Sequence, residues 1–99
     1  MYNEHGDTMK ETIDAINAMR KRLGWDKSDD LKSLIHFLNE EVEELTQEID
    51  KKELDFDAIE QELADVLMVA LALADDLDLD VDAIIKKKMD IVINKYENL

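Results

Sequence analysis

Apolar and polar residues alternate with the period of a helix along most of the chain. The pattern is clearest in the second of four such segments, where apolar residues recur at intervals of one, three or four positions from Leu31 to Ile49. Residues 28–30 can cap its first turn, and the lysines at positions 51–52 suit the negative end of a helix dipole. This segment is predicted to be an amphipathic helix with one buried face.

The third segment is predicted to be a second amphipathic helix. It begins at Asp55 or Asp57, since aspartate is a good N-cap and either position fits the pattern. Glu60 follows Asp57 by three residues, which is the spacing of a capping box. Its apolar positions continue to Leu77.

The first and last segments complete the pattern. A modest apolar stripe runs from about residue 7 to residue 23 before Gly24 stops the helix, and the last helix follows residue 80 and ends near residue 96. Short connections between long helices place neighbours antiparallel. The predicted fold is all-α: an antiparallel helical bundle of about four helices, in one domain over residues 1–99, with residues 1–6 as a frayed tail.

Aspartates alternate with apolar residues from position 76 to position 82, which fits a strand, a calcium loop or a turn. A calcium loop that starts at Asp76 needs Gly at its sixth position and Glu at its twelfth, where this chain has Val81 and Lys87. The missing ligands favour a solvated helix–helix turn with an aspartate cap.

Composition supports the helical prediction and limits the function. Of the 99 residues, 45% are apolar and 38% charged, with two glycines and no proline. The chain is too apolar for a disordered acidic tail, and its turn-forming residues are too scarce for a many-stranded sandwich or barrel. The absence of cysteine excludes disulfides and thiolate metal sites and leaves the redox compartment undetermined.

The net charge is strongly negative, with 26 acidic against 12 basic residues and a formal charge of −14. Such a chain repels nucleic acid and anionic lipid, so we expect no binding to duplex nucleic acid or to a membrane. The first ten residues do not resemble a signal peptide, and no uncharged run approaches the roughly 20 residues of a membrane span. We therefore expect a cytoplasmic location.

The excess acid is concentrated in residues 29–65, which hold fourteen acids and three bases, a net charge of −11. At about 100° per residue, Glu41 and Glu44 border the apolar stripe of the second helix. Glu62 and Asp65 flank the stripe of the third helix in the same way. If the two helices pack antiparallel through these stripes, the four carboxylates meet in one cleft.

A cleft of this kind suggests a cation site, because like charges resist ionising together. Mg²⁺ and Mn²⁺ bind carboxylate oxygens and keep positions for water or substrate phosphate. Asp65 is also the only charged residue between Leu63 and Ala74, a segment expected to be buried on nearly every side, where an unpaired charge is costly. The same acids fit ordinary solvated helix faces, so spacing alone leaves both interpretations open.

Two acidic motifs allow comparison with a known family. Residues 40–44 have the form E-E-x-x-E, and residues 62–65 have the form E-x-x-D. In this order and setting they resemble the MazG-like all-α nucleoside triphosphate pyrophosphohydrolases, and the resemblance extends over about residues 23–96. Further matching residues lie upstream and downstream: Trp25-Asp26-Lys27, Ser33-Leu34, Lys88-Met89-Asp90-Ile91 and Tyr96.

The resemblance implies an enzyme that cleaves a nucleoside triphosphate between its α and β phosphates. The products would be the monophosphate and pyrophosphate, the cofactor would be Mg²⁺ with Mn²⁺ as a substitute, and the role would be nucleotide-pool house-cleaning. By position, Glu41, Glu44, Glu62 and Asp65 match the metal ligands. Glu40 matches an acid assigned to metal binding or to positioning the attacking water, so Glu40 and Glu41 are the candidate catalytic residues.

The resemblance also suggests substrate contacts. Lys32 and Lys88 lie where basic residues of similar proteins approach phosphates, and solvated structural lysines are an equal alternative. In relatives an Asn follows the downstream lysine by four places, whereas this chain has Val92 there and Asn94 two residues later. Trp25 fits either a core anchor or a residue that stacks on a nucleobase.

Self-association is expected as well. Ala64, Met68, Leu71 and Ala72 give the third helix a second apolar face, which a thin bundle of this length does not need to cover. A homodimer or homotetramer would bury that face and complete the bundle, and the resemblance implies the same.

Two alternative functions make different demands on the sequence. A non-catalytic acidic helical module for interaction or oligomerisation predicts that neutralising the four acids raises stability without changing any response to metal. A ferritin-like di-iron bundle requires Glu-x-x-His pairs, and neither His5 nor His36 follows a glutamate at that spacing. His5 falls in the predicted tail, and His36 faces away from the apolar stripe.

Overall fold

The computed structural model describes residues 8–98, and every regular element among them is helical. This confirms the all-α prediction. The predicted tail at residues 1–6, with His5, lies outside the described residues. The elements are α1 (Thr8–Arg22), α2 (Trp25–Ser28), α3 (Leu31–Ile49), α4 (Phe56–Asp76) and α5 (Val81–Glu97).

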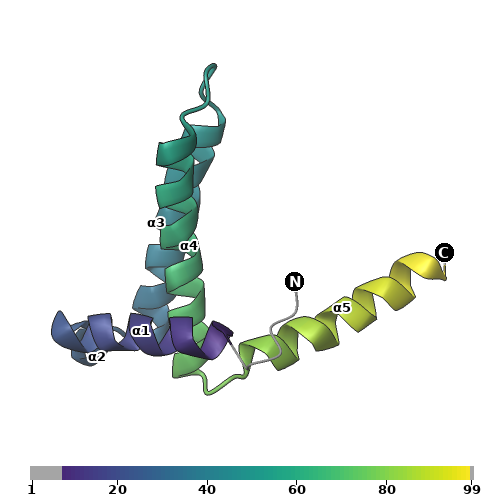
Figure 1. Ribbon diagram of the computed structural model, residues 1–99, viewed down its shortest axis with the longest axis horizontal. Helices are drawn as coiled ribbons and strands as arrows, with labels where there is room; N and C mark the ends of the chain where they lie inside the picture. Colours follow the sequence, from purple (N-terminus) through teal and green to yellow (C-terminus); the bar gives the residue numbers. More distant parts are fainter. Residues whose placement is uncertain (1–7, 99) are drawn as a thin grey trace.

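Helices α3 and α4 form a long antiparallel hairpin (Figure 1), as the two clearest periodic segments predict. Asp30 caps α3 by accepting a hydrogen bond from the backbone N–H of Ser33 at 2.8 Å, and the Ser33 hydroxyl completes a capping box. Asp55 caps α4 by accepting from the N–H of Ala58 at 3.1 Å. Asp55 is therefore the start of this helix, and the alternative start at Asp57 is wrong.

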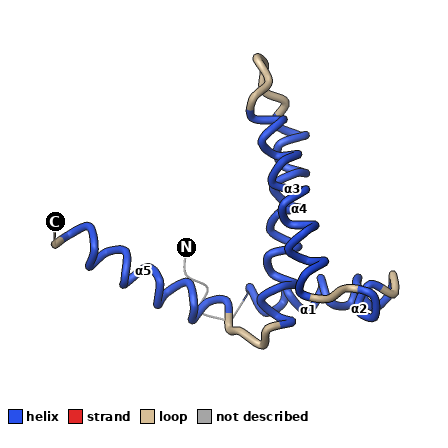
Figure 2. Tube along the Cα trace, turned by 180° about the vertical axis from the view of Figure 1, so that it is seen from behind, coloured by secondary structure: helices blue, strands red, loops and turns tan. Residues whose placement is uncertain are grey.

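Helix α1 crosses the base of the hairpin, beside the short helix α2 (Figures 1 and 2). Ile16 of α1 meets Leu34 of α3 and Ala72 of α4 in the buried cluster of the chain. Met68, Val69, Leu71 and Leu73 pack around it. Of the apolar face expected to mediate self-association, Ala72 is only 3% exposed and Met68 and Leu71 pack against the buried cluster, whereas Ala64 is exposed.

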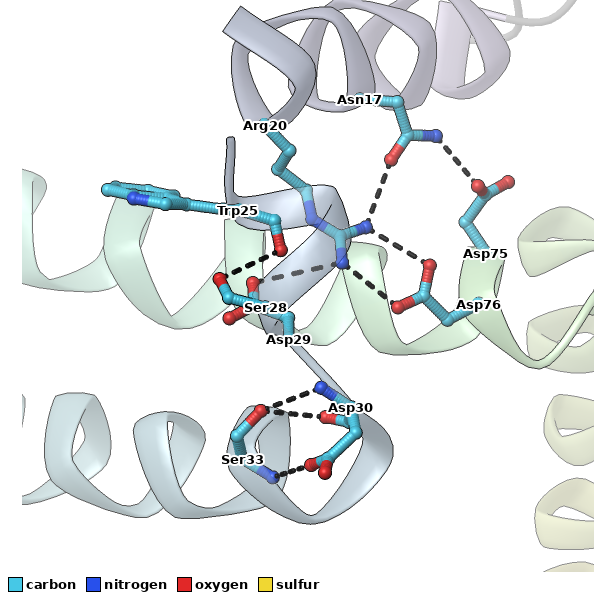
Figure 3. Close-up of polar contacts among 9 residues, drawn as sticks. All are labelled: Asn17, Arg20, Trp25, Ser28, Asp29, Asp30, Ser33, Asp75 and Asp76. Atoms are coloured by element: carbon cyan, nitrogen blue, oxygen red, sulfur yellow. Dashed lines mark hydrogen bonds and ion pairs between the residues drawn. The ribbon is translucent and has the colours of Figure 1, made fainter. Parts of the chain in front are cut away.

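Arg20 fixes α1 against the end of α4 (Figure 3). Its Nη1 and Nη2 donate to the two carboxylate oxygens of Asp76 at 3.1 and 2.9 Å, and Nη1 also donates to Asn17 Oδ1 at 3.2 Å. Asn17 in turn donates to Asp75 at 2.7 Å. Both aspartates lie in the last turn of α4, where negative charge opposes the helix dipole, so a buried cation there stabilises the junction.

The aspartate-rich segment after α4 is a turn, as predicted. The N–H of Leu79 donates to the carbonyl of Ala74 and the N–H of Asp78 to that of Asp75, which is a Schellman motif with Asp78 at a positive φ of 58°. Asp80 then caps α5 by accepting from the N–H of Ala83 at 3.0 Å.

Helix α5 does not close the bundle within one chain. It leaves the turn and extends away from the hairpin (Figures 1 and 2), and the radius of gyration is 16.0 Å, against about 13 Å for a compact domain of this length. After Val81, which is buried, its large apolar residues are exposed, as are Leu63 and Leu67 of α4. The expectation that α4 is buried on nearly every side is therefore wrong for the single chain. The exposed apolar residues of α5 are Ile84, Ile85, Met89, Ile91, Val92 and Ile93.

Candidate metal centre

The hairpin brings together the four predicted carboxylates. Glu41 and Glu44 lie one turn apart on α3, and Glu62 and Asp65 lie one turn apart on α4. One oxygen from each residue lies within 4.8 Å of the corresponding oxygen of every other. The antiparallel packing of two amphipathic helices therefore produces the cleft that the sequence predicts.

Two oxygens in this cluster have no hydrogen-bond donor. Glu41 Oε2 and Glu62 Oε2 are both buried, and no described residue donates to either of them. A buried acceptor without a donor is costly, and more so when it carries charge. The arrangement is therefore incomplete in the protein alone.

The cluster also changes how its members ionise. Burial, together with a hydrogen bond to Glu44 and the charge of Asp65, raises the pKa of Glu41 to about 7. Burial and a hydrogen bond to Glu44 raise the pKa of Glu62 as well. Without a cation, both carboxyl groups hold their protons to a higher pH than usual, which reduces the repulsion.

The donor set fits a hard divalent cation. All four groups are carboxylates, the ligands that Mg²⁺ and Mn²⁺ take, and the two unpartnered oxygens are suited to coordinate an ion directly. A cation would offset the repulsion and provide the missing partner.

A cavity of about 530 Å³ opens beside the cluster, with Glu41 and Asp65 in its wall. Most of the lining is apolar, contributed by α1, α3 and α4. Trp25 of α2 also lines it and is 48% exposed, so the core-anchor interpretation of this tryptophan is wrong. A largely apolar cavity with two carboxylates of the cluster in its wall suits a ligand with a flat apolar part and a metal-binding part.

The structure does not bring the remaining predicted site residues to the cluster. Glu40 lies on the outer face of α3, where its carboxylate is 2.7 Å from His36 Nε2. Lys32 is exposed on α3 and is not in the cavity wall. Lys88 and Asn94 lie on α5, which extends away from the hairpin in Figure 1.

Comparison with known proteins identifies the family. A model of the MazG nucleotide pyrophosphohydrolase domain matches residues 29–98, most of the chain and all of the acidic cluster. The chain belongs to the MazG family. Its fold resembles the crystal structure of a pyrophosphatase from Archaeoglobus fulgidus DSM 4304, with a TM-score of 0.80 and 26% identity, covering 97% of this chain and 98% of that one. No curated protein gave a match.

Of the residues that line the cavity, sequence reasoning assigned only Trp25, Glu41 and Asp65 to a site. Arg20, Asp29 and Phe37 are among those that it missed. A signal for Arg20 was present, because Asp75 and Asp76 end a helix with no base in its last turn and so require a cation from elsewhere in the chain. Nothing in the pattern showed that α1 would supply it.

Among the described helices, none is long and apolar enough to cross a membrane.

The metal-free MazG domain is expected to lose stability as the pH rises from about 4.5 to about 7. In this range the folded protein retains a proton on Glu41 that the unfolded chain releases, so the free energy of unfolding falls with pH and levels off above 7. Denaturant unfolding with a chelator at pH 5.5 and pH 8 measures the difference. Glu41→Gln should flatten this dependence, and an undiminished fall in that variant would contradict the assignment.

Proposed function

We propose that this MazG domain is a divalent-metal-dependent nucleoside triphosphate pyrophosphohydrolase that converts a ribo- or deoxyribonucleoside triphosphate to the monophosphate and pyrophosphate. The observation that carries the proposal is a cavity with Glu41 and Asp65 in its wall. These two residues belong to a cluster of four carboxylates, in which Glu41 and Glu62 each have a buried oxygen without a donor. Membership of the MazG family and the likeness to a pyrophosphatase support it.

Glu41, Glu44, Glu62 and Asp65 are proposed to hold the ion. Mg²⁺ is the proposed cofactor and Mn²⁺ a substitute, since both prefer oxygen ligands; when bound, the ion would neutralise phosphate charge and polarise the reacting groups. Four carboxylates around one cleft would otherwise repel a triphosphate, so the protein's own residues require the cation for substrate binding as well as for reaction.

Glu41 has a further proposed role, because it lines the cavity and belongs to the cluster. It orients a water molecule toward the α-phosphorus. A bond forms from the water oxygen to that phosphorus, the bond to the α–β bridging oxygen breaks, and pyrophosphate leaves with the electron pair. The water's protons pass to the surrounding carboxylates and solvent.

Trp25 is proposed to stack on the nucleobase from the wall of the cavity. The role of Glu40 in metal binding or in positioning the water stays a prediction, and it would require Glu40 to leave His36. A phosphate contact from Lys32 stays a prediction in the same way.

We also propose that the active form is a homodimer or homotetramer. The apolar residues of α5 and the outer face of α4 have no partner among the described residues of one chain, and a second copy would cover them. Assembly is also the route by which Lys88 and Asn94 could reach a nucleotide site, because α5 carries both away from the cavity of its own chain.

Hydrolysis in H₂¹⁸O tests the reaction. Attack on the α-phosphorus puts the label in the nucleoside monophosphate and leaves pyrophosphate unlabelled, which mass spectrometry of a single turnover distinguishes. Label in pyrophosphate would show attack on the β-phosphorus. Release of orthophosphate and a diphosphate would overturn the proposed bond cleavage.

Dilution is expected to separate the subunits, expose the apolar face of α5 and reduce specific activity. Sedimentation over a concentration series, with activity measured at each concentration, would show the two falling together. A monomer with full activity would contradict the proposed assembly.

A further inference from the structure

The guanidinium of Arg20 has a free hydrogen-bonding edge. Arginine carries five N–H groups in a planar fork, and here two bind Asp76 and one binds Asn17. Nε is buried without a partner, in a side chain that is only 6% exposed. The remaining N–H of Nη2 faces Asp29 Oδ2 at 3.8 Å, which is an ion pair but too long for a hydrogen bond.

This edge belongs to a residue of the cavity wall, Arg20, which lies beside the end of α4 and away from the acidic cluster. Arg20 and Asp29 line the same cavity as Glu41 and Asp65. Asp76, which binds Arg20, follows Asp65 on α4 by about 16 Å at 1.5 Å per residue. Figure 3 shows Asp76 on one side of the guanidinium, with Asp29 and Trp25 on the other.

We propose that Arg20 and Asp29 determine base specificity, selecting bases in which a carbonyl group stands next to a ring N–H: uracil, thymine, guanine and hypoxanthine. This inference rests on the proposed function, since it places the phosphates at the acidic cluster and the base beside Arg20 in the same cavity. Arg20 donates to the carbonyl oxygen, and Asp29 accepts from the ring N–H.

The same pair disfavours adenine and cytosine. At the matching positions these bases carry an amino group and a ring nitrogen with a lone pair, so the amino group would face the donors of Arg20 and the lone pair would face the Asp29 carboxylate. Each mismatch leaves buried polar groups unpaired, which is the strongest basis on which a binding site rejects an analogue.

Anchoring of α1 does not explain the free edge. The hydrogen bonds from Arg20 to α4 use only its Nη atoms, which donate to Asp76, and the bond to Asn17 stays within α1. A lysine could provide the same positive charge, whereas only arginine adds a second, rigid pair of donors.

Equilibrium binding of uncleavable α,β-methylene triphosphates in the presence of Mg²⁺ tests the proposal. Inosine and adenosine analogues form one matched pair, and uridine and cytidine analogues form another. The keto member of each pair is expected to bind roughly tenfold more tightly or better. Equal binding within the pairs, preference for the amino member, or no binding of any analogue would overturn the proposal.

Two variants locate the preference. Asp29→Asn can present either an oxygen or an NH₂ group and should reduce the keto preference to about twofold or less, without touching the Arg20–Asp76 pair. Arg20→Lys should also reduce the keto preference, while it keeps a positive charge beside Asp76. Asp26→Asn is the control: it removes one negative charge, as Asp29→Asn does, from an exposed position outside the cavity wall, and it should leave the preference intact. An unchanged preference in folded Asp29→Asn would overturn the proposal.

The binding and hydrolysis assays distinguish failure of the base-selection proposal from failure of the proposed reaction. A preference for the keto bases in the binding assay, without hydrolysis of any triphosphate, would overturn the proposed reaction. It would still support base selection by Arg20 and Asp29. Hydrolysis at the same rate for all bases, with equal binding of the analogues, would overturn only the proposed base selection.

Discussion

Glu41→Gln is expected to lower kcat for triphosphate hydrolysis by roughly a hundredfold to a thousandfold. Glu41 belongs to the four-carboxylate cluster, lines the cavity and has a buried oxygen without a donor. The substitution keeps the shape of the side chain and replaces a charged ligand with a neutral amide, so it weakens cation binding and the orientation of water together. Steady-state pyrophosphate release measures the loss.

Glu43→Gln is the matched control, because Glu43 is an exposed neighbour on the same helix and loses the same charge. It should retain most of the activity. In the absence of metal, Glu41→Gln should be at least as stable as the natural protein at pH 8, since it relieves repulsion in the cluster. An active, folded Glu41→Gln protein would contradict the assigned site.

Mg²⁺ is expected to stabilise the fold strongly. At a concentration one hundred times its dissociation constant, a ligand that binds only the folded state adds about 2.7 kcal/mol to the free energy of unfolding. For a domain of this size that corresponds to a rise in Tm of roughly 10–20 °C. Thermal unfolding with and without Mg²⁺ measures it. The rise should be larger at pH 8 than at pH 5.5, because the ion must displace the proton that Glu41 retains at low pH.

Ionic strength needs its own control in a chain with a net charge of −14, because any salt screens its repulsion. A matched concentration of NaCl should give only a small rise in Tm. Combined substitution of Glu41 and Glu62 by Gln should abolish the specific effect of Mg²⁺ and leave the effect of NaCl. An equal Mg²⁺ response in that variant would favour the acidic interaction module over a metal enzyme.

The acidic cluster was predictable because it depends on local periodicity and one packing rule. The stripes of α3 and α4 place Glu41 and Asp65 at the edges of their apolar faces, and a short connection makes the two helices antiparallel. The turn before α5 was predictable for a similar reason, since Asp80 is a local cap.

The position of α5 was not predictable from the same rules. Periodicity gives the apolar face of a helix and says nothing about which surface that face covers, so the expectation of a closed bundle failed for the single chain although α5 itself forms. The cavity was missed for a related reason. It depends on where α1 crosses the hairpin, and that is fixed by Arg20 binding Asp76, a contact between residues far apart in sequence.

Trp25 illustrates how tertiary packing decides between two chemically reasonable roles. A lone tryptophan in a small domain is usually a core anchor, whereas here it lies on a short helix, lines the cavity and is half exposed. The core is filled instead by Ile16, Leu34 and Ala72, which leave no requirement for a large aromatic residue.

Pyrophosphate release from a panel of ribo- and deoxyribonucleoside triphosphates, with and without Mg²⁺ and beside Glu41→Gln, is the most direct test of the proposed function. The expected result is release that requires the metal, depends on Glu41 and is fastest for bases that carry a carbonyl next to a ring N–H. No release from any triphosphate by a folded protein whose Tm responds to Mg²⁺ would contradict the proposed reaction and would mean that the cluster binds a cation for another purpose.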